Sequence, residues 1–325
     1  MAEEARQVIL SDETGGVGRT VRRFALGLAI IVAVVLALYY PIGMALTHVI
    51  DDGPGFAIEA PPPGASRAVA MAAALIEREV DTHSWTASDP FFLPGAALDN
   101  MPNFQMGVVG ALGRFALEMG DQIARARGSS RIDPDLDRAA GLLRYPGNVW
   151  IWDLSTSFAP TASSETQYRA ARRALLSYNE RLAKKPPAAA FERRADNLLA
   201  MLDRIAADLG SMSAVLDRQV AERSGNLLDF AADDTFYGVK GRLYAYALIL
   251  RELGKDFARV LTDREATRVW EQMVTSFRDA ASLQPWVVIN GAPDSNLLPS
   301  HVAAQGFYLL RARTQLREVT DILRK

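Results

Sequence analysis

One aspartate and two of the three histidines are the residues in this sequence best suited to chemistry. Asp81 and His83 lie two residues apart, and His301 lies far along the chain in NLLPSHVAAQ. Imidazole nitrogens and a carboxylate oxygen suit a divalent metal such as zinc, with one position left open for water or substrate. Asp81, His83 and His301 are therefore the candidate metal site, provided that the fold brings the two segments together.

The spacing of Asp81 and His83 favours a competing interpretation without a metal. Residues two apart on a helix point away from each other, so only an extended backbone would align these two side chains. A histidine near the C-terminus of a helix is also stabilised by the helix dipole alone. Under this interpretation the residues have structural roles and the protein binds no cofactor.

The stretch EREVDTHSWTASDPFFLPGAALDNMPNFQ (77–105) is rich in aromatic residues and prolines. Its aromatic side chains could line a ligand groove or fill the gap where helices cross; they are Trp85, Phe91, Phe92 and Phe104. Asp-Pro and Leu-Pro-Gly are typical of turns. We interpret the stretch as a corner between two helices, while its loop position also suits a binding site.

Two short pieces interrupt the otherwise helical pattern. They are NVWIWDLS (148–155) and PWVVIN (285–290), both rich in β-branched and aromatic residues. The sequence favours either a two-stranded β ribbon or two irregular buried loops. In an extended segment Trp150 and Trp152 would face one side, where they could stack on a sugar ring or pack in the core.

Composition excludes several classes of protein. The chain has no cysteine, which excludes disulfides, thiolate metal sites and cysteine nucleophiles. A net charge of −2 provides no basic field for nucleic acid. The usual hydrolase, phosphate-loop, zinc-helix and Ser-x-x-Lys signatures are absent. The sequence therefore favours a non-catalytic protein and leaves an enzyme open, because a site is defined by geometry rather than by motif.

The strongest pattern is an apolar segment near the N-terminus. Residues 24–46 contain no charge, and about 20 apolar residues suffice to cross a bilayer as a helix. Arginines precede the segment at 19, 22 and 23, which predicts a cytoplasmic N-terminus. The segment is longer than the core of a cleaved signal peptide, so an uncleaved anchor is the favoured interpretation. Pro41 either ends the regular helix or kinks it.

The rest of the chain divides by composition. We expect a cytoplasmic tail over 1–23 that is loose over 1–18, a Pro-rich linker over 47–65 that acts as a stiff spacer, and a periplasmic helical domain over 66–325 that could subdivide near 160. Apolar residues recur at gaps of three and four in this domain. The expected helices cover 66–80, 104–127, 133–145, 165–184, 190–222, 236–260 and 309–323.

The fold class that follows is all-α, a mostly antiparallel helical bundle behind one transmembrane helix. A short Pro-containing turn predicts that 165–184 and 190–222 form an antiparallel hairpin. Glycines at 107, 110 and 113 lie three apart on one expected helix. Such small residues allow another helix to approach closely.

Four stretches carry a resemblance to a known family. They are DDGPGF (51–56), SRAVAMAAALIEREV (66–80), DPFFLPGAALDNMPNFQ (89–105) and GFYLLRARTQLREV (306–319). They resemble an uncharacterised bacterial family, domain-of-unknown-function family 2333. The resemblance implies one N-terminal membrane segment followed by a helical domain, and it supplies no catalytic residues.

Three functional hypotheses follow. The favoured one is a single-pass protein of the bacterial inner membrane whose periplasmic domain is a non-catalytic scaffold or adaptor for another envelope protein. The alternative is a cell-envelope enzyme or enzyme regulator with a site near Asp81, His83 and His301. A sensor that signals through the span is the third, and the lack of an output domain in the short cytoplasmic tail counts against it.

Overall fold

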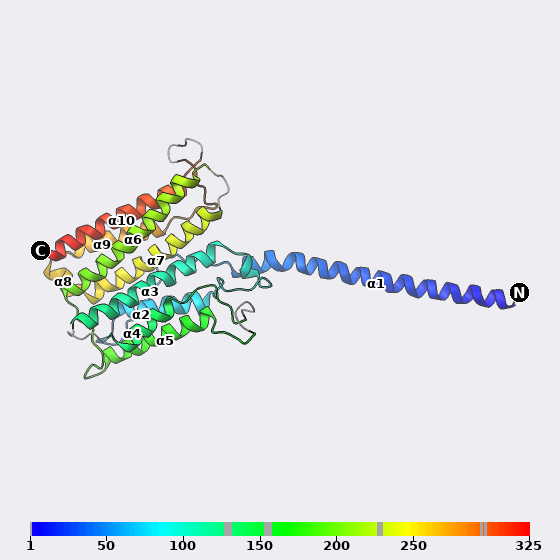
Figure 1. The fold of residues 1–325 in the computed structure, drawn as a ribbon, viewed down its shortest axis with the longest axis horizontal. Helices are drawn as coiled ribbons and strands as arrows, with labels where there is room; N and C mark the ends of the chain where they lie inside the picture. Colours follow the sequence, from blue (N-terminus) through cyan, green and yellow to red (C-terminus); the bar gives the residue numbers. More distant parts are fainter. Residues whose placement is uncertain (1, 127–131, 153–157, 226–229, 293–294, 296–297) are drawn as a thin grey trace.

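The computed structural model describes residues 2–126, 132–152, 158–225, 230–292, 295 and 298–325. A single long helix, α1 (Ala2–Thr47), projects away from a bundle that contains the other helices (Figure 1). The described residues of the bundle include no strand, apart from one isolated bridge between Asn290 and Ser300. The all-α prediction is therefore confirmed.

The apolar part of α1 is a candidate membrane span. It covers Val21–Thr47, and none of its most apolar window is buried in the protein. The helix continues through Pro41 to Thr47, so the helix does not end at this proline. The loose tail expected over residues 1–18 is also wrong, because α1 begins at Ala2. Ala, Glu and Arg are good helix formers, and adding residues to an existing helix is easy once the span provides the nucleus.

The bundle has two groups of helices in contact through a central pair (Figure 1). The first group contains α2 (Arg67–Glu77), the π-helical turn η1 (Arg78–Thr82), the 3-10 turn η2 (Pro94–Ala97), α3 (Asn100–Ala126), α4 (Pro134–Leu143) and α5 (Ser164–Ala183). The second contains α6 (Ala195–Arg223), α7 (Phe230–Asp256), α8 (Ala258–Asp263), α9 (Thr267–Ala281) and α10 (His301–Arg324).

The helix ends agree with local sequence chemistry. Ser66 caps α2 by accepting a hydrogen bond from the amide of Val69, and Asp133 caps α4 ahead of Pro134. Helix α3 begins at Asn100, four residues earlier than its apolar pattern indicates. Helix α9 is not among the predicted helices, although its buried residues recur at helical spacing.

The central pair, α3 and α7, is held at short distance by glycines. A Cβ atom on Gly107 would overlap the carbonyl oxygen of Gly238, and one on Gly241 would overlap that of Phe104. The predicted close approach at Gly107 is thus confirmed, with α7 as the neighbouring helix. Asn103 donates to Asp234 one turn before the Gly107–Gly238 contact, so α3 and α7 run parallel. Other packed pairs, such as α6 with α10, are antiparallel: Arg324 at the end of α10 pairs with Asp203 early in α6, and Gly306 early in α10 lies near Leu216 late in α6.

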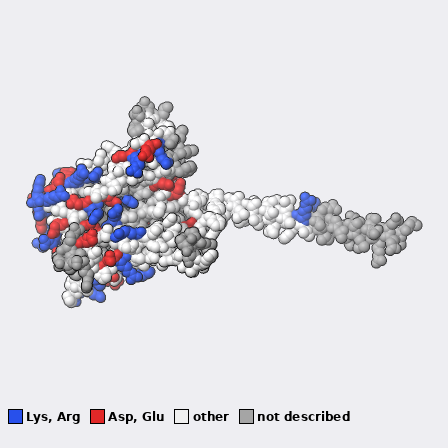
Figure 2. Space-filling view, in the orientation of Figure 1, with Lys and Arg blue, Asp and Glu red and all other residues white. Residues whose placement is uncertain are grey.

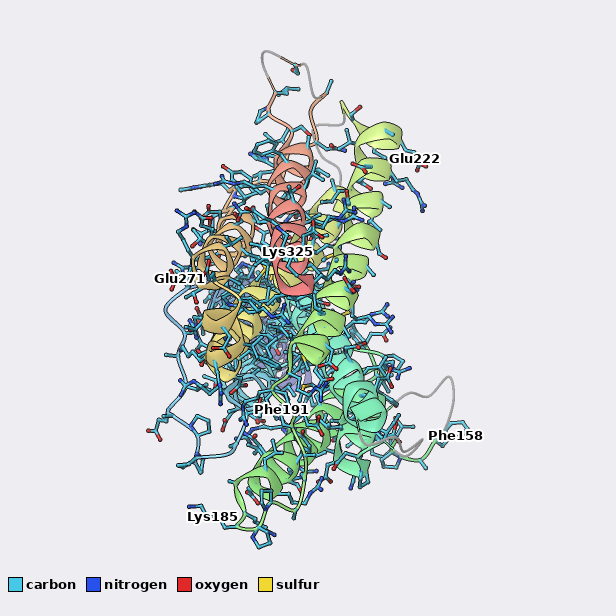
Figure 3. All side chains as sticks on the ribbon, turned by 90° about the vertical axis from the view of Figure 1, so that its left-hand side faces the viewer. Phe158, Lys185, Phe191, Glu222, Glu271 and Lys325 are labelled. Carbon is cyan, nitrogen blue, oxygen red and sulfur yellow. The ribbon has the colours of Figure 1, made fainter. Side chains whose placement is uncertain are left out.

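The predicted hairpin of α5 and α6 is wrong. Helix α5 packs on α2 and α4, whereas α6 packs mainly on α10. The connecting segment runs from Lys185 at one edge of the domain to Phe191 near its middle (Figure 3). There Phe191 packs edge-to-face on Phe257, with ring centroids 5.5 Å apart. The two helices are close in sequence because the connecting segment is short, but contacts with other helices determine where each of them packs.

The predicted ribbon is not formed by the described parts of its two strands. The amide of Thr161 donates to the carbonyl of Ile151, so the first piece contacts its own following loop. The second piece bonds instead to the start of α10, where the amide of His301 donates to the carbonyl of Ile289. Residues 153–155 of the first piece lie outside the described residues.

Candidate functional site at the junction of the span and the helical domain

The segment that leaves α1 lies along the domain and is fixed to it by two ion pairs. Asp51 pairs with Arg78 at 3.4 Å, and Asp52 pairs with Lys240 at 2.6 Å. Carbonyl groups of the same segment accept hydrogen bonds from Tyr244 and Arg251. Residues 51–56, the first part of the expected linker over 47–65, therefore lie against the domain.

Lys240 is the most deeply buried cation of the junction, with 1% of its side chain exposed. Its ammonium also donates to the carbonyls of Ala281 and Leu283, at the C-terminal end of α9. Unpaired carbonyls at a helix end attract a cation. Burial lowers the pKa of Lys240, and the nearby Asp52 carboxylate opposes that shift. The lysine joins three elements: the linker, α7 and the end of α9.

Arg78 has an equally crowded environment on the first turn of η1. Its guanidinium donates twice to one oxygen of Glu79, at 2.6 and 2.9 Å, and once to the hydroxyl of Tyr244. Its face lies over the ring of Phe56, 4.7 Å from the centroid. A charge-assisted fork with a cation–π contact is a geometry that arginine makes and lysine does not.

Glu79 carries the other charge of this cluster. Its side chain is 1% exposed, and burial raises its pKa although Arg78 lowers it. The second carboxylate oxygen has no hydrogen-bond partner among the described residues. A π-helical turn often marks a functional position because it displaces one residue from the regular register. Here the turn directs both Arg78 and Glu79 into the protein, where they pair with each other.

Gln105 on α3 organises the corner that follows η1. Its amide nitrogen donates to the carbonyls of Glu79 and Ser84, and its oxygen accepts from the amide and hydroxyl of Thr86. Trp85 is buried beside it and packs edge-to-face on Tyr168. The interpretation of 77–105 as a corner between helices thus agrees with the structure, since α2 and α3 lie at its two ends.

The same corner also contacts α1. The hydroxyl of Tyr39 donates to the carbonyl of Phe92 at 3.0 Å, and that of Tyr40 donates to the carbonyl of Phe91. One turn further along α1, a Cβ atom on Gly43 would overlap the ring of Pro94. Helix α1 is therefore joined to the domain both through the linker and through this loop.

The three candidate metal ligands are not gathered into one site. Asp81 forms an exposed ion pair with Arg169 at 2.6 Å. The Nδ1 atom of His301 accepts from the amide of Ile289, and burial lowers the pKa of this histidine. The Nδ1 atom of His83 is buried without a partner in the described part of the chain. No group of three or more metal-binding side chains occurs among the described residues.

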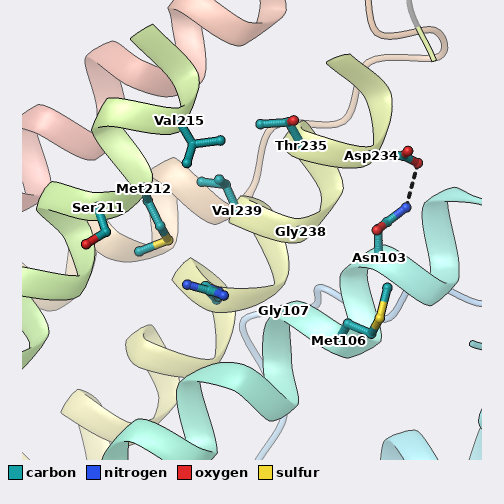
Figure 4. A pocket seen from close by; sticks show the side chains of 11 residues that line it. Asn103, Met106, Gly107, Ser211, Met212, Val215, Asp234, Thr235, Gly238 and Val239 are labelled. Atoms are coloured by element: carbon teal, nitrogen blue, oxygen red, sulfur yellow. Dashed lines mark hydrogen bonds between the residues drawn. The ribbon is translucent and has the colours of Figure 1, made fainter. Parts of the chain in front are cut away.

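A groove opens between α3, α6 and α7 beside the glycine contacts (Figure 4). It encloses about 280 Å³, and its lining includes Met106, Met212 and Val215. Its charged groups are already engaged: Asp234 accepts from Asn103 at 2.6 Å, and Arg242 lies 3.5 Å from Asp208. The groove offers apolar contact more than a poised acid or base.

The other aromatic candidates lie at the edge of the junction. Trp150 packs edge-to-face on Phe92 with centroids 5.5 Å apart, and Trp152 is 45% exposed. No pattern in the sequence predicts that Lys240, Arg78 and Glu79 belong to one site. A signal for Lys240 was present, because this rare lysine occupies the apolar stripe of its helix, four residues after Phe236.

These features define an all-α protein whose helical bundle is joined firmly to one candidate membrane-spanning helix. The chain belongs to a bacterial family described as uncharacterized protein conserved in bacteria, DUF2333, whose model matches residues 19–228 and 228–325. No curated protein and no solved structure matches the chain significantly. The resemblance of the four stretches in the sequence is thus confirmed at the level of the family.

Proposed function

We propose that this is a single-pass protein of the bacterial inner membrane whose helical domain lies on the periplasmic side and acts as a non-catalytic docking platform for another envelope protein. The arginines before the span support this orientation under the positive-inside rule. The junction carries the proposal: Asp52–Lys240, Asp51–Arg78 and Tyr39–Phe92 hold the domain to its anchor. A domain attached in this way presents the same face at the same height above the bilayer, as a platform requires.

The state of the polar groups also supports a non-catalytic role. The buried charges of the junction are paired with one another. In the groove, Arg242 pairs with Asp208, and Asp234 accepts a hydrogen bond from Asn103. A general acid or base must instead reach a substrate atom within hydrogen-bonding distance. Side chains that already satisfy each other are suited to fixing a shape.

The test is crosslinking in living cells, followed by purification of the full chain through a tag after Lys325 and identification of the proteins attached to it. We expect one envelope protein in stoichiometric amount. Asp52→Ala, which removes the countercharge of Lys240, should reduce its recovery severalfold. Asp203→Ala is the matched control, because Asp203 pairs with Arg324 where both side chains are 55% exposed.

Two results would overturn the proposal. Recovery of the chain without a stoichiometric partner would contradict the platform and direct attention to the enzyme or regulator hypothesis, for which His83→Ala and His301→Ala should abolish function in a folded protein. A reporter fused after Lys325 that is active only in the cytoplasm would contradict the orientation.

A further inference from the structure

The loops beside the junction expose a continuous group of large apolar side chains. This group, the aromatic rim, consists of Phe91, Phe92, Trp150, Ile151 and Trp152. Phe91 is 83% exposed, and Phe92, Ile151 and Trp152 are each more than 40% exposed. The loop that contains the two phenylalanines, PFFLPGAAL (90–98), has no charged residue, and neither does NVWIW (148–152). Exposed apolar patches of this kind mark surfaces that contact a membrane or a partner.

The position of the rim along the span indicates which of these it contacts. The carbonyls of Phe92 and Phe91 accept hydrogen bonds from the hydroxyls of Tyr39 and Tyr40, which lie inside the apolar segment Val21–Thr47. Pro94 packs against Gly43, one turn further along the same helix. Two contacts one turn apart fix the loop along the axis of α1 as well as beside it. The rim loop therefore lies at the depth of the last turns of the candidate span.

The chemistry of both partners matches the boundary between lipid and water. Tyrosine and tryptophan concentrate at the headgroup level, where one end of the ring is apolar and the other is wet. Phenylalanine and tryptophan are also the apolar anchors of segments that lie in this interface. If Tyr39 and Tyr40 occupy the headgroup region, the backbone of residues 91–92 occupies it too, and the exposed rings have lipid as their neighbour.

The distribution of charge agrees with this placement. Lys and Arg side chains gather over the end of the domain remote from α1, whereas few of them are visible on the described surface where α1 emerges (Figure 2). Charged groups are costly to bring into the interface, while apolar groups gain from it. The end with few exposed Lys and Arg side chains is the end from which α1 emerges (Figure 1).

We propose that the aromatic rim inserts into the headgroup region of the bilayer next to α1, so that the domain has a second lipid-binding surface in addition to its span. This inference rests on the membrane anchor of the proposed function, but it does not require the docking partner. Its consequence is that the domain lies against the bilayer with its helix ends toward the lipid, and is not free to rotate about the linker.

The chain has no cysteine, so single labels can be placed without removing native ones. We would introduce Phe91→Cys, attach a nitroxide and reconstitute the full chain into nanodiscs of phosphatidylethanolamine and phosphatidylglycerol. Power-saturation EPR then compares accessibility to oxygen, which concentrates in lipid, with accessibility to a nickel chelate, which stays in water. Leu36→Cys in α1 and Phe307→Cys on α10, 61% and 65% exposed, are the lipid and water controls.

We expect Phe91→Cys to favour oxygen severalfold over the chelate, as Leu36→Cys does, and Phe307→Cys to favour the chelate. If position 91 behaves like position 307 while position 36 reports lipid, the rim faces water or a protein partner and the inference is wrong although the anchor stands. If position 36 itself reports water, the anchor fails. Trp152→Cys provides a second rim probe, and circular dichroism checks that each variant is folded.

Discussion

The ion pairs at the two ends of the helical domain differ in how deeply they are buried. At the junction, Lys240 and Asp52 pair where their side chains are 1% and 9% exposed, and Arg78 pairs with Glu79 at 5% and 1%. At the remote end, Arg324 and Asp203 pair with both side chains 55% exposed. Water and salt screen the exposed pair much more than the buried pairs. The junction therefore depends on each partner being present, whereas the remote end tolerates the loss of one.

The difference in stability between matched substitutions at the two ends should be largest when one partner of the buried Asp52–Lys240 pair is removed. Asp52→Ala leaves the ammonium of Lys240 buried without its countercharge, and such a change typically costs about 3–5 kcal/mol. We expect the free energy of unfolding to fall by about this amount in urea titrations of the full chain in nanodiscs. Asp203→Ala is the remote counterpart, with an expected cost below about 1 kcal/mol. Equal effects at the two ends would contradict the comparison.

A substitution that keeps the charge tests geometry separately. Arg78→Lys retains the cation but loses the fork to Glu79 and the contact with the ring of Phe56. Hydrogen bonds to charged groups contribute about 1.5–3 kcal/mol, so a loss of about 2 kcal/mol is expected in the same titration. Arg324→Lys at the remote end should change stability by no more than about 0.5 kcal/mol. A neutral Arg78→Lys would show that the junction needs charge alone.

The contact between α1 and the corner can be tested with a matched pair of glycines. Gly43→Val would force a side chain into the ring of Pro94, whereas Gly27→Val adds one where nothing lies within 4 Å. Overpacking of this kind costs about 1–3 kcal/mol. A cost of about 1.4 kcal/mol corresponds to tenfold faster hydrogen exchange, so we expect at least about tenfold for amides of residues 91–98. Mass spectrometry of exchanged peptides would measure it. Similar exchange in both variants would mean that the corner is held by the linker ion pairs alone.

The smallest effect concerns pH and the first turn of α7. Burial, followed by repulsion from Asp99 and Asp234, raises the pKa of Asp233 to about 6. A raised carboxyl pKa means that the unfolded chain ionises first, so stability is present below pH 4 and is lost as pH rises through 6. Asp233→Asn should therefore raise the free energy of unfolding above that of the wild type, and this gain should be larger at pH 7.5 than at pH 4.5. After solvent screening the difference between the two gains should be about 1 kcal/mol or less. Asp263→Asn, at an exposed pair with Arg259, is the control in thermal unfolding at both pH values.

Local rules predicted most helices but not their neighbours. The stripes of α6 and α7 are buried as their spacing of three and four indicates, from Leu198 to Leu216 and from Phe236 to Phe257. The choice of partner depends on contacts distant in sequence. Helix α5 packs on α2 and α4 instead of α6. Its Asn179 forms hydrogen bonds with the backbone of Ser66, and its Arg181 pairs with Asp133 and Asp135 at the N-terminal end of α4. The length of the connection between two helices does not predict such long-range contacts.

The candidate site shows the same limit. The sequence drew attention to Asp81, His83 and His301 because of their residue types, yet Asp81 lies in an exposed ion pair and His301 bonds to a loop amide. The residues that define the junction have ordinary types, and their importance comes from burial. Asp51 and Asp52 follow the apolar segment, as polar residues commonly do. Their spacing does not predict that they pair with Arg78 and Lys240.

The sequence by itself determined the all-α class, the apolar segment and the family, because helical periodicity, an uncharged run and characteristic stretches are local properties. The tertiary structure alone decided that the linker lies against the domain and that the corner meets α1. Those outcomes depend on pairing charges and carbonyl groups that are about 190 residues apart, such as Asp52 with Lys240 and Gly53 with Tyr244. Buried charges must find partners wherever the chain places them, and only the folded chain shows which partners those are.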